Sequence, residues 1–256
     1  ASMWRFVVAR AIGTSHRRAN LPCQDIFACE VLTGDVLVAA IADGAGSASM
    51  AERGAEIAVV SFIAHLKCGL EDKVTDFNSL LREAAVSART AITVEAELKR
   101  MKVRSYASTL LGIVLTPAGG GALQIGDGVI VVGEGRDEWD WVFWPQRGEY
   151  ANTTNFLTDD DAIQRLEIEG FSSAITDVAL MSDGLESLAL NYASSTVYDP
   201  FFNGMFQPLL KATGDAKIDA LSVSLEKFLS SERVVSRTDD DVSLILATRR
   251  KDEPSQ

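Results

Sequence analysis

Three apolar segments of this chain each end in an aspartate that is followed by glycine. These aspartates are Asp43, Asp127 and Asp183, and a further acidic cluster, residues 239–241, stands in front of the last apolar segment. A single Asp-Gly pair indicates only a turn, because this dipeptide is common where a strand ends. Four acidic strand ends limit the possible folds more strongly, because strands that are distant in sequence can meet at one rim of an antiparallel sheet. The chain is therefore expected to form sheets with an acidic rim.

Strands and helices follow one another in blocks along the sequence. The expected strands cover residues 4–12, 26–32, 36–42, 108–115, 122–125, 129–132, 139–144, 177–181 and 242–248. The expected helices cover residues 49–67, 77–101, 185–190, 201–212 and 215–231. Residues 108–144 are interpreted as one antiparallel meander with a Gly-rich turn at 118–121, and Gly69 as the C-terminal cap of the helix at 49–67. Such blocks favour an α+β fold with antiparallel sheets over a doubly wound parallel sheet.

The chain is strongly acidic. Its 24 lysines and arginines stand against 36 aspartates and glutamates, which gives a formal charge of −12. This charge argues against nucleic acid as a partner, since phosphate contacts require a basic surface, and it argues equally against an anionic membrane surface. No apolar run approaches the ~20 residues that a membrane-spanning helix needs. The surplus of carboxylates fits either a well-solvated surface or a site for hard cations.

Only two histidines and three cysteines offer softer metal ligands. A histidine-rich zinc site is nearly excluded, and Cys23 and Cys29 do not have the spacing of a zinc-binding pair. Reduced cysteines predict a cytoplasmic protein. No linker divides the chain, so residues 1–256 are expected to form a single domain, with residues 1–2 as a cloning remnant and residues 249–256 as a disordered tail.

The acidic rim is expected to bind divalent metal ions. Clustered carboxylates repel one another and have raised pKa values unless a cation joins them. Mg²⁺ and Mn²⁺ suit such a rim, because they accept oxygen ligands and keep several waters. The glycine after each aspartate lets the backbone approach the ion, so that the carbonyl oxygen of Gly44 is a further candidate ligand.

Residues 43–47 lead into the helix expected at 49–67. This order would place a helix N-terminus, with free N–H groups and a positive dipole, beside the metal ions, as in a phosphate-binding site. An ordinary loop of small residues, with Ser47 or Ser49 as the helix N-cap, explains the same pattern equally well.

Six short motifs follow one another between residues 12 and 247. They are His16 with Cys23-Gln24-Asp25, then Ala42-Asp43-Gly44-Ala45-Gly46-Ser47, Ala107-Ser108-Thr109, Gly126-Asp127-Gly128, Ser182-Asp183-Gly184 and Asp240-Asp241-Val242-Ser243. In this order they resemble the metal-dependent protein phosphatases of type 2C, and more closely the short bacterial members of that family. Any single motif is weak, but five or six in order are specific. The stretch Gly148-Glu149-Tyr150-Ala151-Asn152 is similar to a further motif of the bacterial subgroup.

The resemblance implies a four-layer α-β-β-α sandwich, in which two antiparallel sheets lie between helices, with two Mn²⁺ or Mg²⁺ ions at one rim. It implies that Asp43 bridges both metals, that the Gly44 carbonyl contacts one of them, and that Asp183 and Asp240 complete the ligand set. Asp240 is chosen over its neighbours because Asp240-Asp241-Val242-Ser243 aligns with the Asp-Asn-x-Ser of the family. Asp25 matches the aspartate that holds metal-bound water. Asp127 matches a ligand of a third, weaker metal ion.

Three positions depart from the family pattern. Ala45 stands where many members have a histidine implicated as general acid, Gln24 where many have glutamate, and Asn20 where the phosphate-binding arginine usually lies. We therefore take His16 as a catalytic candidate, with a hydrogen-bonding role in its loop as the alternative. Arg17 and Arg18 are candidate phosphate-binding residues, with plain solvation as the alternative.

The function that the resemblance implies is hydrolysis of phosphoserine and phosphothreonine in proteins, by attack of a hydroxide held between two metal ions. The partner is then a phosphorylated protein, the cognate kinase is open, and the protein is expected to be a monomer. A pseudophosphatase that binds a phosphoprotein without hydrolysing it is the alternative, and a phosphatase of small metabolites is a third possibility. The polar stretch 147–161 is interpreted either as a substrate-contacting loop or as a simple connection.

Overall fold

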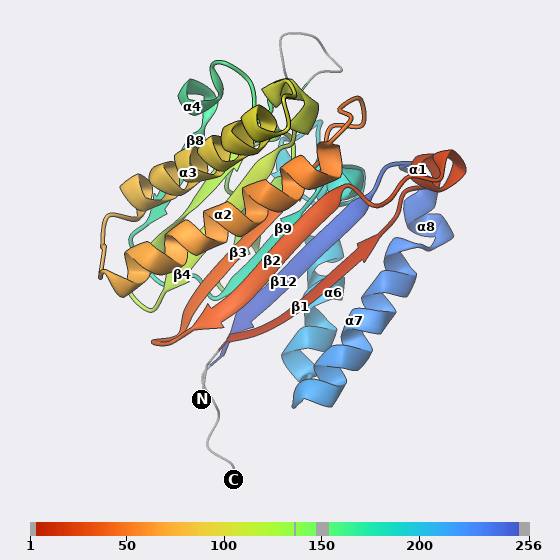
Figure 1. Cartoon of the computed structure of the whole chain (residues 1–256). Coiled ribbons are helices and arrows are strands. Elements are labelled where there is room, and N and C mark those ends of the chain that lie inside the picture. Colours follow the sequence, from red (N-terminus) through yellow and green to blue (C-terminus); the bar gives the residue numbers. More distant parts are fainter. Residues whose placement is uncertain (1–3, 136, 147–153, 251–256) are drawn as a thin grey trace.

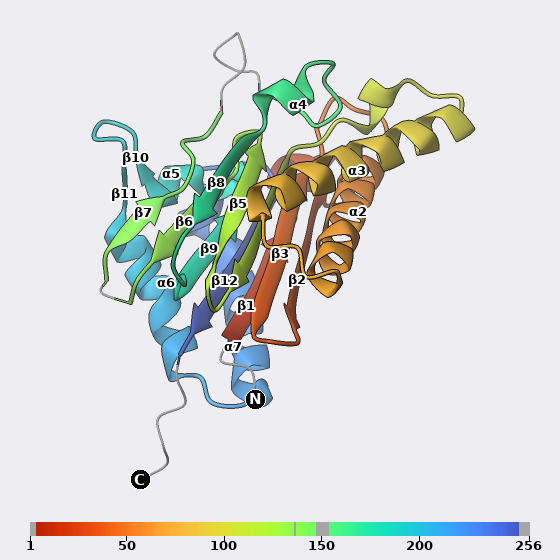
Figure 2. The same ribbon diagram turned by 90° about the vertical axis from the view of Figure 1, so that its left-hand side faces the viewer.

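The computed structural model describes residues 4–135, 137–146 and 154–250, and it contains two five-stranded sheets (Figures 1 and 2). The first sheet has the strand order β1 (Trp4–Ala11), β12 (Val242–Arg249), β9 (Asp177–Met181), β6 (Val129–Gly133) and β7 (Trp139–Trp141). The second has the order β2 (Asp25–Leu32), β3 (Val36–Asp43), β4 (Leu110–Thr116), β5 (Gly119–Ile125) and β8 (Glu167–Phe171). Neighbouring strands are antiparallel throughout both sheets.

Helices cover the outer face of each sheet. The second sheet is covered by α2 (Ala51–Glu71) and α3 (Phe77–Leu98), and the first by α6 (Asp199–Lys211) and α7 (Asp215–Leu229), as Figures 1 and 2 show. The shorter elements are α1 (Thr14–Ala19), η1 (Val103–Tyr106), α4 (Ala162–Arg165), η2 (Asp183–Leu185), α5 (Glu186–Ala189), β10 (Leu190–Asn191), β11 (Thr196–Val197) and α8 (Glu232–Val235). The expected α+β class and the four-layer α-β-β-α sandwich are confirmed.

Three apolar layers hold these four layers together. Strand β3 illustrates the principle, because its side chains alternate between two of them. Val38, Ala40 and Ala42 pack against the layer of α2 and α3. Leu37 and Ile41 pack into the space between the two sheets. A third cluster lies between the first sheet and the helices α5, α6, α7 and α8.

The expected single meander over residues 108–144 is wrong. Strands β4 and β5 form a hairpin in the second sheet, whereas β6 and β7 belong to the first, so the chain crosses between sheets around Asp127. The glycines expected to form a turn lie within β5, where side chains have no room. A Cβ atom on Gly120 would stand 2.1 Å from the carbonyl oxygen of Val114, and one on Gly121 would stand 2.8 Å from Leu81 Cδ1.

Several boundaries also differ from the sequence prediction. Gly69 lies inside α2, where it makes room for Leu80, and the helix ends two residues later. The six-residue helix α1 and the strand β8 were not expected, because neither has a clear apolar period. Arg249 and Arg250 are not part of a frayed tail, since they pair with Asp35 and Asp177 respectively. Residues 1–2, 147–153 and 251–256, about which the sequence made specific predictions, lie outside the described residues.

Gly54 and Gly204 form a matched test of helix packing. Both lie inside helices, where replacing glycine with alanine normally stabilises a protein by about 0.5–1 kcal/mol. A Cβ atom on Gly204 meets nothing within 4 Å, whereas one on Gly54 would stand 2.0 Å from the carbonyl oxygen of Tyr106. We expect Gly204→Ala to show the normal gain. Gly54→Ala should instead lower the free energy of unfolding by about 2 kcal/mol, because α2 must move away from η1. Urea denaturation measures both, and equal effects would contradict the packing described.

Within the part of the chain that the structure describes, no helix has the length and apolar character needed to cross a membrane.

Candidate metal centre

The candidate site lies where four strands from the two sheets have their ends. Asp43 ends β3, Asp25 begins β2, Asp183 follows β9, and Asp240 precedes β12. Asp25 and Asp43 are direct partners in the register of β2 and β3. Carboxylate oxygens of Asp43, Asp183 and Asp240 all lie within 4.8 Å of one another. The structure therefore brings together the three aspartates that the sequence proposed as the core of the site.

Backbone contacts fix the position of Asp43. Its N–H donates to the hydroxyl oxygen of Thr109 at 3.0 Å, and its carbonyl accepts from the Thr109 N–H at 2.9 Å. The next residue, Gly44, donates to the carbonyl of Gln24 at 3.1 Å. A Cβ atom on Gly44 would stand 2.7 Å from the backbone of Ala51, so only glycine fits where β3 passes under the start of α2. The motif at residues 107–109 thus serves to hold the aspartate.

Asp25 is completely buried beside Asp43. Neither of its carboxylate oxygens has a hydrogen-bond partner of good geometry. Burial raises the pKa of Asp25 to about 6, and the nearby hydroxyls of Ser182 and Ser243 oppose part of this rise. A buried carboxylate with unused oxygens is costly for a fold, and such groups usually have a ligand or a catalytic role.

The other aspartates of the cluster also favour their protonated form. Burial raises the pKa of Asp43 well above its usual range, and the charges of Asp25, Asp183 and Asp240 raise it further. Burial likewise raises the pKa values of Asp183 and Asp240. The site is therefore an accumulation of repelling carboxylates that cations would stabilise.

The donor set fits divalent metal ions. The cluster offers carboxylate oxygens alone, which is the ligand type that Mg²⁺ and Mn²⁺ prefer. Oxygens around one such ion lie about 2.1 Å from it, hence up to about 4.2 Å from each other. The oxygens of the three aspartates, all within 4.8 Å of one another, need only small shifts to reach this spacing. Oδ1 of Asp183 is buried without a hydrogen-bond partner, like the oxygens of Asp25, so ligand atoms are available.

Asp127 lies at the edge of this cluster. It is not among the three carboxylates that share the 4.8 Å limit. Of the neighbouring charges that raise the pKa of Asp183, however, that of Asp127 is the largest. Glu186 acts on Asp183 in the same way and was missed in the sequence. The spacing of Asp183 and Glu186, which puts both on one side of a helical turn, could have indicated it.

Asp241 has a different position from its neighbour Asp240. It is 1% exposed. Its Oδ1 accepts from the N–H of Gly13 at 2.7 Å, and its Oδ2 accepts from the N–H of Gln24 at 2.7 Å. Nδ1 of His16 lies 2.8 Å from the same Oδ2. Asp241 thus ties the loop between β1 and β2 to the start of β12, and it forms a second acidic group with His16 and Asp240.

Replacing Asp241 with alanine is expected to lower the free energy of unfolding by about 2 kcal/mol, because two buried N–H groups lose their acceptor. Asp239→Ala, which removes an exposed carboxylate from the same run, is the matched control and should have little effect. Chemical denaturation of both variants without metal provides the measurement. A similar loss in the two variants would show that Asp241 does not anchor the loop.

The structure places the basic candidates on α1. Arg17 and Arg18 are exposed there, and neither side chain forms an ion pair within the described ranges. His16 is held by Asp241, as described. Asn20, which stands at the usual position of the phosphate-binding arginine, caps α1 with φ +55°, a conformation that asparagine adopts readily.

The segment after Asp43 does not lead directly into a helix. Helix α2 begins at Ala51, after Met50, and neither Ser47 nor Ser49 caps it with a side chain. The segment instead forms a turn that is held by Ala45, whose N–H donates to the carbonyl of Ala107 at 2.9 Å. The expected serine cap is therefore wrong, whereas the start of α2 does lie beside Gly44, and phosphate binding at this helix end stays a prediction.

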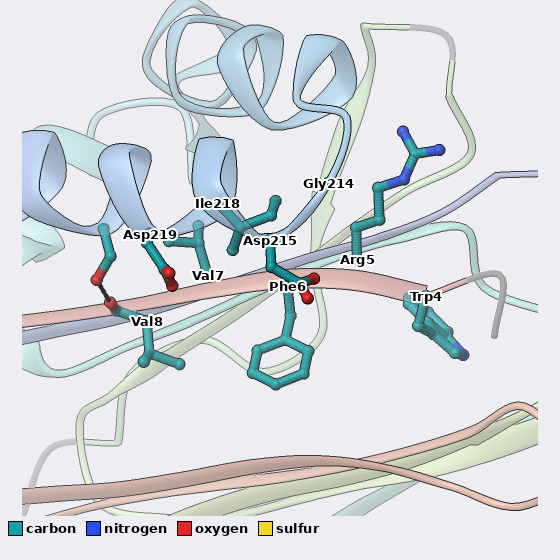
Figure 3. Close-up of a pocket in the computed structure, with 10 residues that line it drawn as sticks. Trp4, Arg5, Phe6, Val7, Val8, Gly214, Asp215, Ile218 and Asp219 are labelled. Atoms are coloured by element: carbon teal, nitrogen blue, oxygen red, sulfur yellow. Dashed lines mark hydrogen bonds between the residues drawn. The ribbon is translucent and has the colours of Figure 1, made fainter. Parts of the chain in front are cut away.

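A cavity of about 450 Å³ lies elsewhere, between β1 and α7 (Figure 3). It is lined by Trp4, Phe6 and Ile218 among others. These strand residues belong to the end of β1 opposite to Ala11, which pairs with Val242 beside the aspartates. The cavity is therefore separate from the acidic rim.

Comparison with known proteins agrees with this geometry. A sequence model of the family described as protein phosphatase 2C matches residues 12–230. The chain is 39% identical over 251 residues to serine/threonine-protein phosphatase 3 of Escherichia coli (strain K12), a match that covers 95% of this chain and 98% of that protein.

Solved structures share the fold at lower identity. The catalytic domain of the serine/threonine protein phosphatase PstP, solved with two manganese ions, matches with a TM-score of 0.65 and 16% identity over 96% of this chain and 97% of that chain. The Mycobacterium tuberculosis phosphatase PstP/Ppp matches with the same TM-score and identity over 97% of this chain and 99% of that chain.

Proposed function

From the premise that the chain belongs to the protein phosphatase 2C family, we propose how its residues carry out the reaction. The protein is a metal-dependent phosphatase that hydrolyses phosphoserine and phosphothreonine in proteins. The observation that supports a working site is the cluster of Asp43, Asp183 and Asp240, whose carboxylate oxygens lie within 4.8 Å of one another. A pseudophosphatase without metal is not favoured, because the carboxylates that a metal needs are present and close together.

Two Mn²⁺ or Mg²⁺ ions are the proposed cofactors, in keeping with the two manganese ions of the PstP structure. The solved structure of RsbX, which shares the fold with a TM-score of 0.58 and 14% identity, contains magnesium. In our proposal Asp43, the Gly44 carbonyl, Asp183 and Asp240 would hold the two ions, with Asp43 able to serve both. Asp127, whose charge acts on Asp183, is the proposed ligand of a third ion.

Bound metal ions supply a nucleophile at neutral pH and neutralise charge on the phosphoryl oxygens. In our proposal, Asp25 orients the attacking water, since its unpartnered oxygens lie beside Asp43. Arg17 and Arg18 bind the phosphoryl oxygens, as guanidinium groups commonly do. His16 donates a proton to the leaving oxygen from Nε2, because Asp241 already engages its Nδ1.

The substrate is a phosphorylated protein, and we propose further that residues 1–256 act as one catalytic domain and as a monomer. A cytoplasmic location is supported by the cysteines, because Cys23, Cys29 and Cys68 are all free thiols. The described part of stretch 147–161 contacts α3 through Arg89, which donates to the carbonyls of Leu157 and Asp159 at 2.6 Å. The N–H of Leu157 also donates to the carbonyl of Ser108, next to the Thr109 that holds Asp43, which supports our proposal that this stretch lies beside the substrate.

The test is turnover of phosphoserine and phosphothreonine peptides with Mn²⁺, with excess chelator as the control. Isothermal titration with Mn²⁺ is expected to show two sites. A protein that takes up no metal and releases no phosphate would disprove the proposal. A panel of phosphorylated metabolites in the same assay separates a protein phosphatase from a metabolite phosphatase, and we expect the peptides to have the higher kcat/KM.

A further inference from the structure

A cavity of about 370 Å³ is lined by residues from the segments that follow Asp183 and precede Asp240 in the chain. Residues from α5, β10 and α8 line it, over a floor of two leucines. Its polar lining consists of Ser187, Asn191, Tyr192, Tyr198, Arg233 and Arg237. We call this cavity the arginine groove.

The groove is positively charged although the chain as a whole carries −12. Arg233 and Arg237 are its only charged lining residues. In contrast, carboxylates line the cavity between β1 and α7, the cavity between α2 and α3, and the cavity beside Glu134. Within the described residues, neither arginine side chain forms an ion pair or a hydrogen bond.

The two arginines are also close to each other in the chain, with Arg233 in α8 and Arg237 in the turn that follows it. They are four residues apart, and the N–H groups of Arg237 and Thr238 continue the helical turn by donating to the carbonyl of Val234. Val234 is buried and fixes this turn against the core. Like charges at this spacing repel, so the pair is unfavourable unless an anion lies between them. Both guanidinium groups line the same cavity, and each has the planar set of donors that suits a carboxylate or a phosphate.

The arginine groove is continuous with the metal-binding segments on both sides. Asp183 begins η2, which leads directly into α5 and its groove residue Ser187. Arg237 stands three residues before Asp240, and three residues span at most about 11 Å. A peptide whose phosphoresidue occupies the aspartate cluster would therefore extend a side chain into the groove.

We propose that the arginine groove binds an acidic side chain of the phosphoprotein, about two to four residues from the phosphoserine or phosphothreonine. This inference rests on the phosphatase function proposed above. Arg233 and Arg237 pair with the acidic group, which is either a carboxylate or a second phosphate. Tyr192 and Tyr198 provide the side wall, and Tyr192 is braced by Trp144, whose ring centre lies 5.7 Å away. The groove is thus a specificity site that favours substrates with acidic flanks.

The experiment compares three phosphothreonine peptides that differ only in the flanking residues: alanines, aspartates or a second phosphoserine. For the natural chain, we expect kcat/KM about tenfold higher for both acidic peptides than for the alanine peptide, with a preference that shrinks as salt rises. The double variant Arg233→Ala/Arg237→Ala should lose this preference. Lysine at both positions should retain part of it, because the charge remains but the planar set of donors is lost.

Arg82→Ala/Lys99→Ala is the matched control. It removes the same charge from exposed positions at α3, on the other side of the molecule, and should keep the preference. Fluorescence polarisation of the same peptides measures binding independently of turnover. If the natural chain hydrolyses all three peptides equally, or if the alanine variant loses activity equally on all three, the groove is not a specificity site. Equal affinity of the natural chain for all three peptides would likewise show that the groove is not a specificity site. If the natural chain hydrolyses none of the peptides, the phosphatase proposal itself fails.

Discussion

Replacing Asp43 with asparagine is expected to lower kcat on a phosphopeptide by at least about 10³-fold, which corresponds to about 4 kcal/mol in the activation free energy. Asp43 is the register partner of Asp25, and its carboxylate lies within 4.8 Å of those of Asp183 and Asp240. An amide retains the shape of the carboxylate but lacks the charge that would bind two cations. The measurement is phosphate release at saturating Mn²⁺.

The same substitution should stabilise the metal-free protein. At neutral pH the Asp43 carboxylate is held among like charges in a desolvated place, and an amide removes that repulsion. We expect the free energy of unfolding in chelator to rise, because an amide carries no charge to be desolvated or repelled by the neighbouring carboxylates. A residue that is needed for activity but lowers the free energy of unfolding shows such opposite effects when it is replaced.

Asp219→Asn is the matched control. It removes a carboxylate from the exposed face of α7 and should change neither quantity measurably. A stabilised Asp43→Asn variant with full activity would show that Asp43 is not a metal ligand. An inactive and destabilised variant would show that the loss comes from the fold.

Most strands could be located from sequence because their side chains are apolar on both faces. In β3, for example, alternate residues pack against helices and against the other sheet, which produces the continuous run that ends at Asp43. The same property concealed which sheet each strand joins. Strands β4, β5 and β6 all read as buried, and nothing in their pattern indicates that the chain changes sheets at Asp127.

Some residues of the candidate site could likewise be predicted from sequence, and others could not. Asp43 and Asp183 could be predicted because each follows a buried strand and precedes glycine. The choice of Asp240 required the order of motifs, since only the structure shows that Asp241 turns toward Gly13 and Gln24. Glu186 could have been found from its spacing to Asp183. The arginine groove could not be predicted, because its lining residues are brought together only by the way the short segments after β9 and before β12 fold.

Metal binding should weaken the pH dependence of stability. The pKa of Asp25 is about 6 in the folded, metal-free chain, whereas an aspartate in an unfolded chain titrates near ~3.9. The folded state therefore binds more protons than the unfolded state between these values, and its stability falls as pH rises through them. Asp25 alone accounts for about 3 kcal/mol of this loss. The raised pKa values of Asp43 and Asp183 add to it in the same direction.

We therefore expect the melting temperature in chelator to fall between about pH 4.5 and pH 7.5. Mn²⁺ at about 100 times its Kd should raise it by about 5–10 °C at the upper pH, since it adds about 2.7 kcal/mol. At the lower pH it should have little effect, because protons occupy the ligands. Calorimetry at both pH values, with and without metal, gives the four melting temperatures required.

Asp25→Asn isolates the contribution of one group. It should flatten the profile in chelator, because an amide does not titrate, and it should raise the melting temperature at pH 7.5 while leaving the value at pH 4.5 nearly unchanged. It should also retain most of the stabilisation by Mn²⁺, since Asp43, Asp183 and Asp240 still provide the cluster. If the melting temperature of Asp25→Asn in chelator falls with pH as steeply as that of the natural chain, then Asp25 is not a group whose titration destabilises the metal-free protein.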